Sequence, residues 1–258
     1  MTTTTGDTVR IEIPFPPRAV PTLRLRTGPC HLRFTPAEGP AWINGTYSDP
    51  TQTLPIDIRS EDAGATIAQR IDLATVGEIQ LPRLDLAISR ERPFAVDIQA
   101  GASDSTFDLG GLPLTRLVMK AGAGRFDVDF STRNPMTMAR MDLELGAGAF
   151  FARHLANANF AELRVGGGIS ACTLDFAGDL RGDANARVDA GFASLDIVVP
   201  AATSARVLVK SFAAGTQVSS GFTRSGDTYY TPPAVAGQHP LLAIDISMAF
   251  GMLGLRTP

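Results

Sequence analysis

The chain has 258 residues, of which 44% are hydrophobic and 19% charged, so it can bury the core of one large domain or of two smaller ones. Its formal net charge of −3 argues against nucleic acid and anionic membranes as partners, because proteins that bind polyanions usually present a basic face.

The two cysteines, Cys30 and Cys172, lie far apart within alternating apolar patterns, and we expect buried free thiols rather than a disulfide or a reactive or metal-binding role.

The start of the chain, MTTTTGDTVRIEIPFPPRAV, lacks the basic segment and apolar run of a signal peptide. No window of the sequence approaches the roughly 18 apolar residues of a membrane span. We therefore expect a cytoplasmic protein without direct membrane insertion, which can associate with a membrane through a partner.

Residues 1–90 predict an N-terminal β region. Short alternating runs such as LPIDIRS and LPRLDLAIS are separated by loops rich in Pro, Asp and Thr. The stretch LRLRTGPCHLRF has an apolar residue at every second position on both sides of Gly28, which indicates a strand, a glycine corner and a second strand. We interpret residues 1–90 as a continuation that caps the repeats that follow.

Residues 91–258 repeat the same strand–glycine–strand pattern every 20 to 25 residues. Apolar residues alternate before and after each glycine, which is typical of strands with one face in a core. The glycines are Gly101, Gly122, Gly146, Gly166, Gly191 and Gly215. A period of this length indicates stacked supersecondary units. The predicted fold is all-β, a single elongated β-solenoid-like domain with glycine corners; the alternative is a β-sandwich.

The Gly-Ala-Gly of KAGAGRFDVDF could also be a phosphate loop or a calcium turn. A phosphate loop requires GxxxxGK[ST], or GxGxxG between a strand and a helix, and neither pattern occurs. Calcium-binding β-rolls repeat every nine residues, whereas Asp127 and Asp129 alternate with apolar residues as on a solvated strand face. We therefore interpret the glycines as corners.

The residues two positions before four of these glycines alternate in charge. They are Lys120, Glu144, Arg164 and Asp189. If the coils stack with their glycines aligned, each of these side chains lies about 4.8 Å from a residue of opposite charge. The sequence thus predicts an exposed charge ladder that sets the register and adds little stability.

The C-terminal region predicts a loop and a last strand pair. Residues 219–240 are polar and rich in Gly and Pro, which favours a long exposed excursion. Residues 241–258 return to a strand, a corner at Gly251 and a second strand. We interpret them as the final coil of the repeat region, residues 91–258, which forms one continuous structural unit with residues 1–90.

No pattern of catalytic or metal-binding residues emerges. The histidines His31, His154 and His239 are isolated, and neither HExxH nor GxSxG occurs. We assign no catalytic, cofactor or metal residue. Trp42 and the pair Tyr229 and Tyr230 are interpreted as packing or loop-anchoring residues, with a sugar platform or partner surface as the alternative.

A carbohydrate-active β-helix enzyme with stacked carboxylates remains an alternative. Its residues would be Asp104, Asp108, Asp127, Asp129 and Arg153. A small-molecule or metal-binding module is a further alternative, which needs a concave polar site.

The sequence resembles a known family. The runs FDLGGLPLTRLVMKAGAGRFDVDF, MDLELGAGAFFARHLANANFAELRVGGGISACTLDFAG and ARVDAGFASLDIVVP are similar to the toastrack domains of LiaF-like cell-wall-active antibiotic response proteins and of DUF4097-type repeats. The resemblance implies a repetitive β fold and a non-enzymatic, protein-binding role in bacterial envelope-stress signalling. LiaF-like proteins carry transmembrane helices ahead of this domain, and we expect none in this chain.

The favoured hypothesis is therefore a protein-interaction or assembly scaffold. Its partner is another protein or a second copy bound through the edge of a terminal coil. No cofactor is expected.

Overall fold

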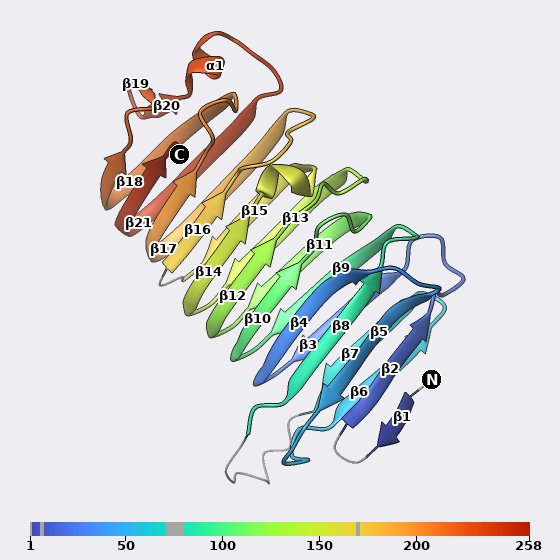
Figure 1. The fold of residues 1–258 in the computed structure, drawn as a ribbon. Coiled ribbons are helices and arrows are strands. Elements are labelled where there is room, and N and C mark those ends of the chain that lie inside the picture. Colours follow the sequence, from blue (N-terminus) through green and yellow to red (C-terminus); the bar gives the residue numbers. More distant parts are fainter. Residues whose placement is uncertain (1, 6–7, 71–79, 169–170) are drawn as a thin grey trace.

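A computed structural model describes residues 2–5, 8–70, 80–168 and 171–258. Within these residues, the strands join one continuous sheet that winds into a solenoid-like, nearly closed barrel (Figure 1). The all-β, solenoid-like prediction is confirmed. One hydrogen-bonded sheet takes the place of the two packed sheets of a sandwich.

Eight described strands come from the first ninety residues, and residues 71–79 of that predicted region lie outside the described part. The strands are β1 (Thr2–Thr5), β2 (Thr8–Pro14), β3 (Thr22–Thr27), β4 (Cys30–Ala37), β5 (Ala41–Ser48), β6 (Ile56–Glu61), β7 (Gly64–Gln69) and β8 (Arg83–Ser89).

The central repeats contribute the next eight strands and a single 3₁₀ turn. These are β9 (Phe94–Ala100), β10 (Ser103–Asp108), β11 (Leu114–Ala121), β12 (Gly124–Asp129), β13 (Met138–Leu145), β14 (Gly148–Arg153), η1 (Leu155–Ala158), β15 (Phe160–Gly167) and β16 (Ala171–Asp175).

Longer strands that run through their corners dominate the C-terminal region. They are β17 (Ala184–Val198), β18 (Ala205–Val218) and β21 (Leu242–Arg256), with the short β19 (Thr223–Ser225), β20 (Thr228–Tyr230) and α1 (Pro232–Val235) between the last two. In the described part of the chain, no helix has the length and apolar character needed to cross a membrane.

Each coil contributes one strand to each of two facing walls. The first wall holds the strands that precede the corners, namely β7, β3, β9, β11, β13, β15 and the first halves of β17, β21 and β18. The second wall holds the strands that follow, namely β8, β4, β10, β12, β14, β16 and the second halves of β17, β21 and β18. All of these pairings are parallel.

The parallel register stacks like residues in columns inside the barrel. Phe126 lies opposite Phe150, which lies opposite Cys172, and all three side chains are buried. Because side chains alternate along a strand, every second residue of each wall enters this one core and the others face solvent. The period-2 pattern of the sequence thus becomes a continuous apolar interior.

The order of the coils in space differs from their order in the chain at the N-terminal end. The coil formed by β3 and β4 lies between the β7–β8 coil and the β9–β10 coil. Beyond β8, the second wall continues through the antiparallel strands β5, β2 and β1. Trp42 of β5 is fully buried there, with its ring 6.1 Å from that of Phe15 and 5.8 Å from that of Phe94.

The C-terminal strand pair requires a correction. Residues 241–258 were expected as the final coil, but β21 lies between β17 and β18, so the outermost coil is β18. β21 thereby gains a parallel partner on both sides along nearly its whole length, which satisfies its backbone hydrogen bonds.

The region predicted as a long exposed loop, residues 219–240, also contains regular secondary structure that packs on the last coil. β20 pairs antiparallel with the first half of β18 and with β19. Tyr229 and Thr231 are buried against the barrel, and the Thr231 hydroxyl donates to the carbonyl oxygen of Thr203 at 2.7 Å. This hairpin covers half of the last coil.

Candidate functional site

The glycine corners are places where stacked backbones come too close for a side chain. A Cβ atom at Gly122 would lie 2.7 Å from the carbonyl oxygen of Gly101, and one at Gly146 would lie 2.5 Å from that of Gly122. Two residues later, Gly124 and Gly148 have φ angles of 121° and 143°, a region that favours glycine. The neighbouring backbone therefore excludes a side chain at these positions, as expected for tight corners between stacked coils.

Gly28, Gly101 and Gly191 share the row of Gly122 and Gly146, as the spacing predicted, whereas Gly166 does not. Gly28 donates its backbone N–H to the Gln69 side chain at 2.7 Å, and Gly101 lies beside it. The pairing of Gly167 with Leu145 places Gly168, not Gly166, in the row of Gly146 and Gly191.

Two predicted corners near the C-terminus are also displaced. Gly251 lies opposite Ala193 and Ala214, and Gly215 lies opposite Met252, so neither shares the row of Gly191. In this region each chain segment turns its corner within one continuous strand. The position of a glycine in the sequence therefore does not mark the position of the corner.

The structure brings only part of the charge ladder together. Lys120 lies opposite Glu144, with Nζ 2.7 Å from the carboxylate. Beyond them the row continues through Gly166 to Asp189, while Arg164 lies opposite Asp142 and Arg187. The four residues therefore do not form one row, because the coil that contains Arg164 has its corner two residues later than the spacing suggested.

The carboxylates of the alternative enzyme hypothesis share the outer face of the second wall. Asp108 lies opposite Asp129, which lies opposite Arg153. Arg125 holds Asp127 through two nitrogens at 2.7 and 3.2 Å, and its backbone N–H donates to Asp104 at 3.3 Å. Asp127 is thus paired with an arginine of the same face, while Asp108 accepts from the Ser131 hydroxyl and the backbone N–H of Gly110, an arrangement typical of a solvated sheet surface.

The histidines lie apart from one another on the surface. Nδ1 of His154 is 2.7 Å from Asp129, and Nδ1 of His239 is 3.0 Å from Asp183. The hydrogen bond from His239, followed by that from the backbone N–H of Leu241, lowers the pKa of Asp183 below its ordinary value. Among the described residues, no three His, Cys, Asp or Glu side chains gather as metal ligands would.

Both cysteines are free and buried, as expected. Burial raises the pKa of Cys172 to about 12 and also raises the pKa of Cys30. We predict that neither thiol reacts with Ellman's reagent in the native protein at pH 8, and that both react at once in denaturant. Since the folded state keeps the thiols protonated, stability should fall as the pH rises above the ordinary thiol pKa. Rapid labelling of the native protein at either position would contradict this burial.

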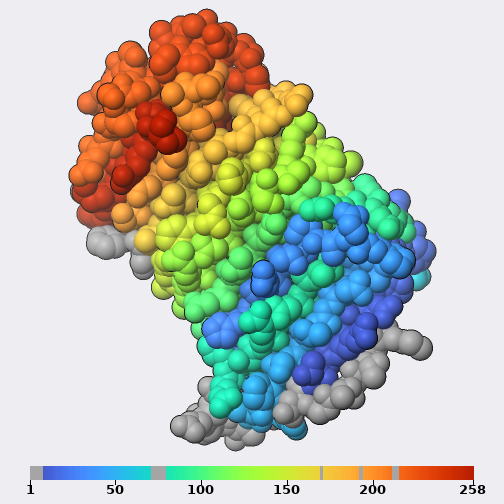
Figure 2. Space-filling model, in the orientation of Figure 1, coloured from blue at the N-terminus to red at the C-terminus, as the bar shows by residue number. Residues whose placement is uncertain are grey.

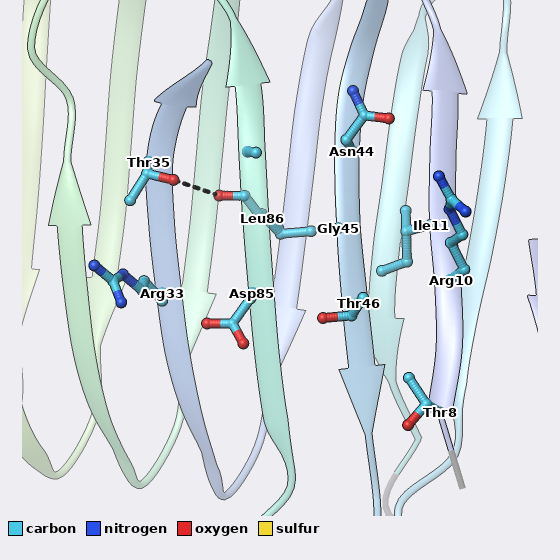
Figure 3. Close-up of a pocket in the computed structure, with 11 residues that line it drawn as sticks. Thr8, Arg10, Ile11, Arg33, Thr35, Asn44, Gly45, Thr46, Asp85 and Leu86 are labelled. Atoms are coloured by element: carbon cyan, nitrogen blue, oxygen red, sulfur yellow. Dashed lines mark hydrogen bonds between the residues drawn. The ribbon is translucent and has the colours of Figure 1, made fainter. Parts of the chain in front are cut away.

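A hollow of about 670 Å³ lies on the outer face of the second wall near its N-terminal end (Figure 3). β2, β5, β8 and β4 form its walls and floor. Arg10 and Arg33 stand on opposite sides, with Thr46 and Asp85 between them. Sequence reasoning missed this hollow, because it depends on β5 joining β8 and β2, strands that are distant in the chain.

The opposite end of the barrel is only half covered. The second half of β18 pairs with β21, and no described strand pairs with its other edge. Thr216 and Val218 lie there opposite Leu253 and Leu255, which are buried, but both residues of β18 are exposed. Figure 2 shows this end in orange and red, far from the blue N-terminal strands.

Three large apolar side chains of β18 and β21 are exposed at this end of the barrel. Val218, Phe250 and Met252 are 38%, 49% and 46% exposed. Phe250 and Met252 come from β21, the direct neighbour of β18. We call Thr216, Val218, Phe250 and Met252 the uncovered end.

Comparison with known proteins gives a family match. The model described as the N-terminal domain of toast_rack, DUF2154, matches residues 18–150, which is just over half of the chain. Among curated proteins, none matches significantly.

Several solved structures are similar over nearly the whole chain. A proposed cell adhesion protein from Clostridium sporogenes is 11% identical, with 97% of this chain and 99% of that chain covered and a TM-score of 0.46. A proposed adhesin from Bacteroides fragilis is 11% identical, with 96% and 95% covered and a TM-score of 0.49. A proposed lipid-binding protein from Parabacteroides distasonis is 12% identical, with 96% and 93% covered and a TM-score of 0.37.

Proposed function

The chain belongs to the toast-rack family, and we propose that it works as a non-enzymatic protein-interaction and assembly scaffold. The uncovered end is its docking site, and the partner that we propose for it is a second copy of the chain. The family likeness makes bacterial envelope-stress signalling the cellular setting that we propose. The observation that carries the proposal is the open edge of β18 beside exposed apolar side chains.

An open strand edge offers unpaired N–H and C=O groups to another strand. Proteins usually protect such edges with charges, proline or a covering segment. The sequence from Ser211 to Phe222 contains no charged residue and no proline. The edge is thus suited to strand pairing, and Val218, Phe250 and Met252 add apolar surface to bury beside it.

The N-terminal end of the barrel is different. There the second wall ends on β1, and the first wall ends on β6, which presents Asp57, Arg59 and Glu61, with Arg59 paired to Asp57 at 2.7 Å. Charges on an edge strand oppose pairing with another sheet. We therefore propose that two copies meet at their uncovered ends, which gives a closed pair rather than an open filament.

Light scattering across a concentration series tests this proposal. We expect the wild-type chain to dimerise as its concentration rises. Val218→Lys should weaken dimerisation by about tenfold or more, because it places a charge in the pairing edge. The matched control is Val235→Lys, which changes an exposed valine of α1 away from the edge. A monomer at every concentration, or equal association of both variants, would overturn the assembly proposal.

A further inference from the structure

We propose that the hollow between β2, β5, β8 and β4 binds an anionic carbohydrate. This site lies on the outer face of the second wall, at the opposite end of the molecule from the uncovered end (Figures 1 and 3). It does not depend on the proposed assembly.

The hollow carries positive charge. Most arginines on this face are already paired: Arg83 holds Asp85 at 2.6 and 3.0 Å, Arg125 holds Asp127, and Arg256 holds Asp196. By contrast, Arg33 joins no ion pair among the residues that the structure describes, and Arg10 shares the exposed face of β2 with Glu12. Since Arg83 neutralises Asp85, the hollow keeps an excess of positive charge although the whole chain is acidic.

The hollow has a width that suits a small sugar. Arg10, Thr46, Asp85 and Arg33 lie opposite one another on four successive strands. The two arginine backbones are therefore about 14 Å apart, three strand spacings. The shorter side chains of Thr46 and Asp85 lie between the two long arginines. A ligand of one or two sugar rings fits this span and can meet a guanidinium at each side.

Neutral polar side chains line the hollow beside the two arginines. Thr8, Thr35, Thr46 and Asn44 bring hydroxyl and amide groups to the hollow. The Thr35 hydroxyl has only a long bond of 3.4 Å to the Leu86 carbonyl oxygen, so it can also accept from a ligand (Figure 3). Guanidinium groups recognise carboxylates and phosphates, while hydroxyls and amides suit the alcohol groups of a sugar. The combination favours a carbohydrate with a carboxylate or a phosphate over a simple inorganic anion.

Titration calorimetry at low salt tests the site with three probes of known chemistry: a galacturonic acid trisaccharide, glycerol phosphate and inorganic phosphate. A neutral galactose trisaccharide is the ligand control. We expect binding of the acidic trisaccharide or of glycerol phosphate, which tells whether the anion is a carboxylate or a phosphate. Raising the salt should weaken that binding, because it screens the two guanidinium groups.

Arg10→Gln and Arg33→Gln should each weaken binding by about tenfold or more, the loss expected for one charge-assisted hydrogen bond. The matched control is Arg26→Gln, an exposed arginine on the first wall that should leave binding unchanged. Equal unfolding midpoints would show that all three variants fold. The proposal is overturned if neither anionic probe binds, if Arg26→Gln has the same effect, or if inorganic phosphate or the neutral sugar binds as well as the acidic sugar.

Discussion

Gly148→Ala is expected to lower the free energy of unfolding by about 4 kcal/mol, the sum of an overlap and a strained backbone. Gly148 opens β14 with a φ of 143°, and an added Cβ would overlap the carbonyl oxygen of Gly124 in the coil beside it. Neither atom can move aside, because both belong to backbones held by parallel hydrogen bonds. Urea unfolding followed by circular dichroism measures the change through the shift in the midpoint.

Gly166→Ala is the matched control. The sequence pattern marks Gly166 as a corner, but no heavy atom lies within 4 Å of the position that its Cβ would take. Its φ is outside the region that favours glycine. We expect this variant to be neutral or slightly more stable than the wild type. If Gly148→Ala were equally harmless, the close stacking at the corners would be refuted.

The contrast between these two glycines shows how far the sequence can predict this fold. Alternating apolar residues on both sides of a recurring glycine are enough for strands, corners and a stacked core. The run RVGGGIS offers three glycines, however, and a spacing count cannot choose among them. The register places Gly168 in the corner row, and this shift of two residues also moves Arg164 out of the predicted charge ladder.

The order of the coils could not be read from the chain. β21 enters between β17 and β18, and the β3–β4 coil lies between two coils that come later in the sequence. Parallel strands of similar length and apolar pattern are nearly interchangeable as neighbours, so their order depends on long-range packing. Both proposed sites follow from this order, since the uncovered end exists because β18 is outermost, and the hollow exists because β5 lies beside β8 and β2.

In the return turns between coils, a buried asparagine side chain forms hydrogen bonds with the backbone of neighbouring coils. Asn134 is fully buried in the return after β12, where its Nδ2 group donates to the carbonyl oxygens of Leu114 at 2.8 Å and Ala158 at 3.2 Å. Its Oδ1 accepts from the backbone N–H of Met136 at 2.9 Å. One side chain therefore satisfies backbone groups of three successive coils. The sequence carries a faint sign of this role, because Asn157 recurs in the next return, where its Nδ2 group donates to the carbonyl oxygen of Phe130 at 3.0 Å and its Oδ1 accepts from the backbone N–H of Asp179 at 3.0 Å.

Asn134→Leu is expected to cost about 4 kcal/mol of stability, because three buried backbone groups lose their partner while the volume of the side chain is nearly kept. Asn185→Leu, an exposed asparagine of β17, should change stability by less than about 0.5 kcal/mol in the same urea unfolding experiment. Asn134→Asp separates hydrogen bonding from packing. At pH 7 its carboxylate would face two carbonyl oxygens without a proton to donate, and burial would raise its pKa. The stability of that variant should therefore recover as the pH falls and the carboxyl group takes up a proton. A loss that does not change with pH would mean that packing, not the hydrogen bonds of Asn134, holds the three coils together.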